Sequence, residues 1–74
     1  MGKFYNKEKI DMLKEQYPPG TRIRLLWMND TQSPPINTVG TVKGVDDIGQ
    51  ILMTWDNGSS LNLIIDEDEF EVLK

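Results

Sequence analysis

A chain of 74 residues is long enough for one small domain, and this one contains neither Cys nor His. Disulfides, thiolate metal sites and the common catalytic centres built on Cys or His are therefore excluded, and stability must come from packing. The net charge of −4 is unevenly distributed, because residues 44–74 carry eight acidic residues against one Lys, whereas residues 17–43 carry three basic residues against one Asp.

The sequence has no stretch approaching the ~20 apolar residues that span a bilayer, and its first residues lack the apolar core of a signal peptide. We therefore expect a cytoplasmic protein without membrane contact. The apolar fraction of 38% is sufficient for a compact core and too high for a disordered chain.

The first predicted element is a short helix over residues 6–16, within a capping segment of residues 1–17. Asn6 is a favourable N-cap, and Tyr5 before it can pack against Ile10 as a hydrophobic staple. Three apolar residues recur at helical spacing and form one narrow stripe: Ile10, Leu13 and Tyr17. So short a helix is marginal alone, and we expect it to dock on the rest of the chain.

Residues 18–74 form the β part of the predicted domain, and Pro18-Pro19-Gly20 at their start ends the helix. The first strand is predicted over residues 21–28. Its alternation places three apolar side chains on the inward face (Ile23, Leu25 and Trp27) and two basic ones on the outer face (Arg22 and Arg24).

A polar loop follows over residues 29–38 and contains the adjacent prolines Pro34 and Pro35. It is long for a tight barrel, and long loops often carry binding function. The alternative interpretation is that the prolines only stiffen the loop and lower its conformational entropy.

The remaining strands are predicted by short apolar runs over residues 39–45, 50–55, 59–65 and 70–73. Gly40 and Gly44 in the second strand indicate a bulge or a close approach of two backbones. Trp55 ends the third strand on the inward face, so both Trp27 and Trp55 are predicted to be core residues.

Asp56-Asn57-Gly58 is the strongest turn signal in the chain. A two-residue type I′ turn requires positive φ at both central positions, which Asn57 and Gly58 tolerate best. We interpret this segment as a hairpin turn rather than a chemical site, because a catalytic Asp56 would need a base or metal partner that the sequence does not offer.

Five short strands, with one long loop and otherwise tight turns, predict a mainly β fold. The order of loops favours a small five-stranded SH3-like barrel with one N-terminal α-helix over one of its ends.

Several segments then carry a resemblance: "YPPGTRIRLLWMND", the "PP" of the loop, "GTVKGVDDIGQI", "WDNGSSLNLI" and the final "FEVL". Over residues 17–73 the chain resembles the family called domain of unknown function 4314 (DUF4314). The resemblance implies a small barrel, often encoded on plasmids, conjugative transposons or phages of Gram-positive bacteria, with no established activity. A looser similarity to the repeat domain of mind-bomb-type ubiquitin ligases and to KOW motifs implies peptide or RNA binding but no site residue.

The predicted function is a non-enzymatic protein-interaction module of unknown partner, present as a monomer or weak homodimer, with no catalytic, cofactor-binding or metal-binding residue. A barrel of this size has little room for a deep pocket, which also argues against an enzyme. The predicted partner-binding residues lie in or beside the long loop: Tyr17, Asn29, Asp30, Pro34 and Pro35.

Two alternatives use the charged residues. Arg22, Arg24 and Lys43 could form a basic strip for weak nucleic-acid binding in an accessory KOW-like domain, although pairing of the arginines with carboxylates is the interpretation we favour. The acidic cluster of Asp66, Glu67, Asp68, Glu69 and Glu71 lacks the spacing of a calcium loop and is predicted to be a solvated turn. It could also act as a DNA mimic that inhibits a host nucleic-acid-binding protein.

Overall fold

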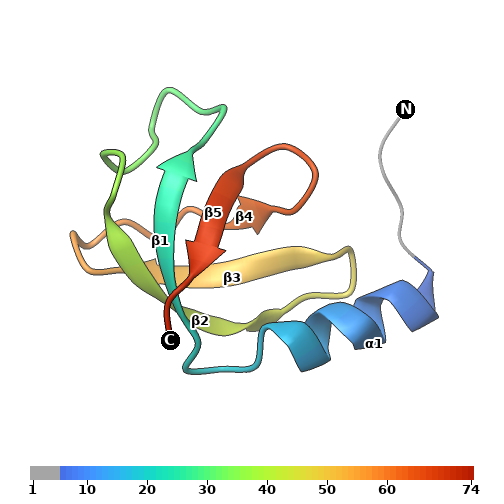
Figure 1. Cartoon of the computed structure of the whole chain (residues 1–74). Helices are drawn as coiled ribbons and strands as arrows, with labels where there is room; N and C mark the ends of the chain where they lie inside the picture. The colour runs from blue at the N-terminus through green and yellow to red at the C-terminus, as the bar shows by residue number, and fades with distance from the viewer. Residues whose placement is uncertain (1–5) are drawn as a thin grey trace.

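The protein, described over residues 6–74 by a computed structural model, is mainly β with one N-terminal helix (Figure 1). Its elements are α1 (Lys7–Gln16), β1 (Arg22–Trp27), β2 (Val39–Val45), β3 (Gln50–Trp55), β4 (Leu63–Ile64) and β5 (Glu69–Val72). The strands form a five-stranded antiparallel sheet in the order β4-β3-β2-β1-β5. Strands β1 to β4 are therefore neighbours in chain order, and β5 returns to lie beside β1.

The sheet is not closed into a barrel. Strands β4 and β5 are its two edges, and no ladder joins them within residues 6–74. Strand β4 has only two residues, paired with Gln50 and Ile51 of β3, and so offers few backbone groups to a second neighbour. The general prediction of a mainly β fold with five strands and one helix is confirmed.

Helix α1 begins as predicted, because the Asn6 Oδ1 accepts a hydrogen bond from the Lys9 N–H at 2.8 Å. Ile10 and Leu13 are buried on the side that faces β2, so the helix is held by packing (Figure 1). The staple residue Tyr5 lies outside the described residues. Docking of the helix on the sheet thus rests on two buried side chains one helical turn apart.

Strand β1 differs from its prediction at its last residues. The pairing with β5 passes from Leu25 opposite Phe70 to Trp27 opposite Glu69, so Leu26 is an extra residue in a bulge. The bulge breaks the alternation, and Trp27 is 46% exposed while Met28 is buried. The prediction of Trp27 as a core residue is therefore wrong, and that of Trp55, which is 1% exposed, is confirmed.

The two glycines of β2 have the two roles predicted for such residues. The register with β3 shifts between Val42 and Gly44, which places a bulge there. Gly40 lies against Trp55, and a Cβ on Gly40 would be 2.6 Å from Cε3 of the indole. Absence of a side chain at Gly40 therefore makes room for the largest residue of the core.

The turn at Asp56-Asn57-Gly58 is a hairpin loop, but not of the predicted type. Gly58 has φ +92°, whereas no positive φ occurs at Asn57. The Trp55 N–H donates to the Ser59 O at 2.9 Å, and the Gly58 N–H donates to the Trp55 O at 2.9 Å. This is a three-residue loop closed by a left-handed glycine, in place of the two-residue type I′ turn.

Strand β4 is shorter than the predicted run over residues 59–65. The Asn62 Oδ1 accepts from the Met53 N–H at 3.3 Å, and the Leu61 O accepts from the Trp55 Nε1 at 2.8 Å. The Asn62 amide and the Trp55 indole thus make hydrogen bonds in place of backbone–backbone bonds between β3 and the residues before β4. Regular pairing with β3 is confined to Leu63 and Ile64.

Candidate interaction surface

The long loop between β1 and β2 is held by its own turns. The Ser33 N–H donates to the Asp30 O at 3.1 Å, and the Thr38 N–H donates to the Pro35 O at 3.1 Å. Asn37, within the second turn, is left-handed, with φ 76°, a conformation that Asn tolerates better than most residues. Two successive turns therefore give these residues a defined path despite the absence of regular secondary structure.

Asp68 connects this loop to the turn between β4 and β5. Its Oδ1 accepts from the Asn29 N–H at 3.3 Å, and its Oδ2 accepts from the Ile64 N–H at 2.8 Å. Asp68 is 9% exposed, so the prediction of a solvated acidic turn is wrong at this residue. A buried carboxylate that satisfies two backbone donors fixes two segments distant in sequence against each other.

Three exposed apolar side chains lie around the start and end of the loop, and we call them the Trp27 surface: Leu26 (39% exposed), Trp27 (46%) and Ile36 (51%). Leu26 and Trp27 follow from the bulge at the end of β1. The backbone next to Ile36 is joined to the end of β1, because the Asn37 N–H donates to the Leu25 O at 2.7 Å. Clustered exposed apolar residues are typical of interaction sites on small proteins.

The predicted partner-binding residues are only partly brought to this surface. Asn29, Asp30 and Pro35 are exposed in the loop, whereas Pro34 is buried and therefore not available to a partner. Tyr17 is half-buried, with its ring 5.7 Å from that of Phe70 in an edge-to-face contact. Tyr17 is therefore placed in the packing between the helix end and β5 rather than in the loop.

The sequence patterns did not predict that Leu26, Trp27 and Ile36 form an exposed surface. The signal that could have identified the first two is the run Leu26-Trp27-Met28, because three consecutive apolar residues cannot all follow the alternation of a strand. Nothing in the sequence distinguishes Ile36 from a core residue of the loop.

The basic strip is largely neutralised. Arg22 donates from Nη1 and Nη2 to the Asp56 carboxylate at 3.0 and 2.7 Å, and Arg24 Nη1 donates to the Glu71 carboxylate at 2.9 Å. Lys43 is exposed and makes no ion pair with any described residue. Arg22 and Arg24 therefore show the carboxylate pairing that the sequence favoured over a row of free cations.

The ion pair between Arg22 and Asp56 also shifts the pKa of both side chains. Hydrogen bonding to the Arg22 guanidinium lowers the pKa of Asp56 below its ordinary value of 3.8, partly opposed by loss of hydration. Hydrogen bonding to Asp56 in turn raises the pKa of Arg22. The bidentate geometry is the reason that Arg, rather than Lys, suits this position.

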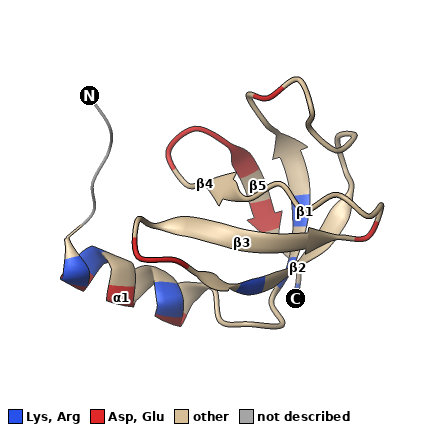
Figure 2. Ribbon diagram, turned by 180° about the vertical axis from the view of Figure 1, so that it is seen from behind, with Lys and Arg blue, Asp and Glu red and all other residues tan. Residues whose placement is uncertain are grey.

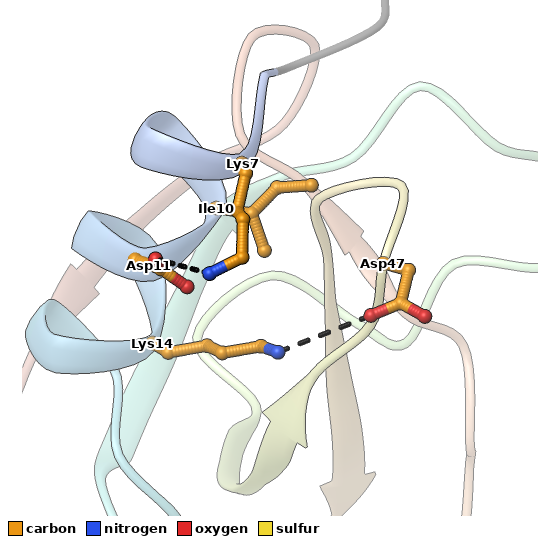
Figure 3. A pocket seen from close by; sticks show the side chains of 5 residues that line it. All are labelled: Lys7, Ile10, Asp11, Lys14 and Asp47. Atoms are coloured by element: carbon orange, nitrogen blue, oxygen red, sulfur yellow. Dashed lines mark hydrogen bonds and ion pairs between the residues drawn. The ribbon is translucent and has the colours of Figure 1, made fainter.

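A hollow of about 380 Å³ lies between α1 and the β2–β3 turn (Figure 3). Its lining residues are Lys7, Ile10, Asp11, Lys14 and Asp47. Lys7 Nζ is 3.4 Å from the Asp11 carboxylate and Lys14 Nζ is 3.9 Å from the Asp47 carboxylate. Figure 3 marks both ion pairs with dashed lines. Because each cation lies beside an anion, the hollow has no excess of one charge with which to select a ligand.

Within residues 6–74, no group of three or more acidic side chains is placed to hold a metal ion. In the described part of the chain, no helix is long and apolar enough to cross a membrane.

Fold and surface together define a small mainly β domain, with a helix beside the sheet and exposed apolar residues around its long loop. The chain belongs to the DUF4314 family, a domain of unknown function, whose sequence profile matches residues 6–73. The match includes α1, which the resemblance over residues 17–73 had left out. No curated protein and no solved structure gives a significant match to the chain.

Proposed function

We propose that this protein is a non-enzymatic interaction module with a partly open, SH3-like arrangement of strands, which binds a protein partner at the Trp27 surface. Support for the arrangement comes from the sheet order, in which β5 returns beside β1 while β2, β3 and β4 follow as a meander. A cytoplasmic location and an origin on a bacterial mobile element are further parts of the proposal that rest on sequence and family resemblance.

The observation that carries the proposal is the exposure of Trp27 at the end of β1. An indole that is half accessible loses part of the stabilisation it would have in the core, yet it offers a large rigid apolar surface to a partner. The connection through Asp68 holds the adjacent loop in place, which lowers the entropic cost of binding there.

The nucleic-acid alternative has less support. Its two arginines make ion pairs with Asp56 and Glu71, and they would have to break these pairs to contact phosphates. The DNA-mimic alternative is weakened in a similar way, since Asp68 is buried and Glu71 is paired. Neither alternative uses the exposed apolar residues.

A random peptide library displayed on phage and selected on the immobilised full chain tests the proposal. We expect selected peptides to bind Trp27→Gln and Ile36→Gln at least about tenfold more weakly than the unmodified protein, as loss of an anchor predicts. Met12→Gln is the matched control, because Met12 is an apolar residue of α1 that is 52% exposed. Failure to select any peptide, or equal binding to all variants, would overturn the proposal.

A further inference from the structure

The surroundings of the Trp27 surface are acidic. Glu69 is the register partner of Trp27 across the β1–β5 ladder, and Glu67 precedes it in the same turn. Asp30 follows Asn29, whose N–H is bonded to Asp68 of that turn. Figure 2 shows Asp and Glu on the β4–β5 turn and in the β1–β2 loop, both above β3 in this view, with α1 below it.

These carboxylates differ from those on the outer face of the sheet. Asp56 and Glu71 each form an ion pair with an arginine. Glu67 and Glu69 are exposed, and their side chains make no hydrogen bond or ion pair with any described residue. Among the described residues no cation therefore pairs with Glu67 or Glu69, whereas Asp56 and Glu71 are each paired with an arginine.

From this geometry we infer that the partner segment is basic: a peptide with an apolar anchor that packs on Trp27 and with Lys or Arg beside it that faces Glu67 and Glu69. This inference rests on the proposed function and names the chemistry of the partner. Opposite charge across an interface fixes partner choice and accelerates association. A cation placed over the exposed face of the indole gains additional attraction from the ring.

The same charges disfavour other occupants of this surface. A second copy of the chain would bring like carboxylates together, and a nucleic acid would bring phosphates beside Glu67 and Glu69. An acidic peptide would meet the same repulsion. A basic segment, by contrast, gains from the charges of Glu67 and Glu69.

Three synthetic peptides of twelve residues test the inference, each with the same Leu and Trp anchors but with Lys, Gln or Glu at all other positions. They are titrated into the ¹⁵N-labelled full chain at about 50 mM and about 500 mM salt, which brackets weak and strong screening. At low salt we expect the Lys peptide to bind at least about tenfold more tightly than the Glu peptide, with the difference reduced at high salt. The Trp27 indole and the amides of residues 67–69 should shift first.

Two double variants separate a local effect from general attraction to an acidic protein. Glu67→Gln with Glu69→Gln should lower the preference for the Lys peptide several-fold. Glu8→Gln with Glu15→Gln removes the same charge from α1 and should leave that preference unchanged. Equal loss in both double variants would mean diffuse attraction and would overturn the inference.

The other outcomes are also decisive. Equal binding of the Gln or Glu peptide at the Trp27 surface would overturn the basic-partner inference and leave the proposed function standing. Failure of all three peptides to bind, together with an empty library selection, would overturn both. Line broadening at Trp27 that depends only on protein concentration would identify a second copy as the occupant and would also overturn the inference.

Discussion

At the scale of single residues, Trp55 can pack in the core because Gly40 has no side chain to occupy the same space. A Cβ on Gly40 would lie 2.6 Å from the indole Cε3 and 3.0 Å from both the Met53 Cε and the Thr54 O. Trp55 is 1% exposed and its Nε1 is bonded to the Leu61 O, so the ring has little freedom to move away. The glycine is required for its lack of volume and not for an unusual φ.

We therefore expect Gly40→Ala to lower the free energy of unfolding by about 1–3 kcal/mol, the usual cost of overpacking a well-filled core. Urea unfolding followed by circular dichroism measures the change. Thr54→Ala, at an exposed position of the neighbouring strand, adds no atom to the core and serves as the control. Stability of Gly40→Ala equal to that of the unmodified chain would contradict the assigned contact.

The ion pair of Arg22 and Asp56 predicts a pH dependence with a definite sign. The pKa of Asp56 is lower in the folded protein than its ordinary value of 3.8, so folding favours the charged carboxylate. The pair therefore stabilises the fold above that ordinary value, and its contribution is lost as the pH falls through the lowered pKa. The side chains are 45% and 53% exposed, so solvent screening keeps the effect small.

Titration of the Asp56 carboxyl carbon by NMR tests this directly. We expect Arg22→Gln to raise the pKa of Asp56 towards 3.8, because the hydrogen-bonded guanidinium is the main cause of the depression. The loss of stability caused by Asp56→Asn at neutral pH should shrink as the pH falls below 3.8. An unchanged midpoint in Arg22→Gln would show that another group is responsible.

At the scale of elements, the two hairpins share one loop geometry. In the β2–β3 hairpin the Asp46 N–H donates to the Gln50 O, and the Gly49 N–H donates to the Asp46 O. In the β3–β4 hairpin the Trp55 N–H donates to the Ser59 O, and the Gly58 N–H donates to the Trp55 O. Gly49 and Gly58 have φ of 87° and 92° at the equivalent third position of each loop. Both loops thus need a left-handed residue there, which favours glycine.

Gly58→Val should consequently destabilise the fold by about 1–3 kcal/mol, because a β-branched residue is strained at this φ. The space around Gly58 is open, so the cost comes from the backbone alone. Gly58→Asn is the informative comparison, since Asn adopts the left-handed conformation more easily, and it should lose less. Thermal unfolding of the two variants in parallel gives the ranking, and a Val variant at least as stable as the Asn variant would contradict it.

The long loop and the β4–β5 turn form a second unit at this scale, joined by Asp68. Removing its carboxylate leaves the Asn29 and Ile64 N–H groups without their acceptor. We expect Asp68→Ala to cost about 1–3 kcal/mol, because two hydrogen bonds to a buried, charged carboxylate are lost. Amide hydrogen exchange should accelerate at Asn29 and Ile64, while the neighbouring control Glu67→Ala leaves both rates unchanged. Unaltered exchange at Asn29 in Asp68→Ala would argue against the connection.

The elements that sequence patterns predicted well are those set by local rules. The Asn6 cap, the buried pair Ile10 and Leu13, and the glycine roles in β2 follow from capping, helical spacing and backbone permissiveness. The bulge at Leu26 depends on partners far along the chain, Glu69 and Phe70. The short β4 depends on a side-chain hydrogen bond within its own hairpin, from the Met53 N–H to the Asn62 Oδ1. Alternation alone cannot reveal where a distant strand shifts its register, and this is why the exposed Trp27 was missed.

At the scale of the whole molecule, the helix and the sheet have to stabilise each other. A ten-residue helix is marginal alone, and α1 is held by Ile10 and Leu13 against β2. The sheet in turn has a small core cluster, which consists of Ile23, Leu25, Met28, Val42, Ile51, Met53, Trp55 and Leu63. Leu13 of α1 is fully buried outside this cluster, so loss of the helix would remove burial that is additional to the sheet's own core.

We therefore expect the full chain to unfold in urea as one unit, with the helix signal at 222 nm and the fluorescence of Trp55 changing together. A Trp27→Phe background makes Trp55 the sole fluorescent indole among the described residues, and it should cost little because Trp27 is 46% exposed. Adding Ile10→Ala and Leu13→Ala to this background removes the contact between α1 and β2. The helix signal should then be lost at a lower urea concentration than the Trp55 signal. Separate transitions in the background protein itself would show that the helix is an independent segment and that the sheet holds its core without it.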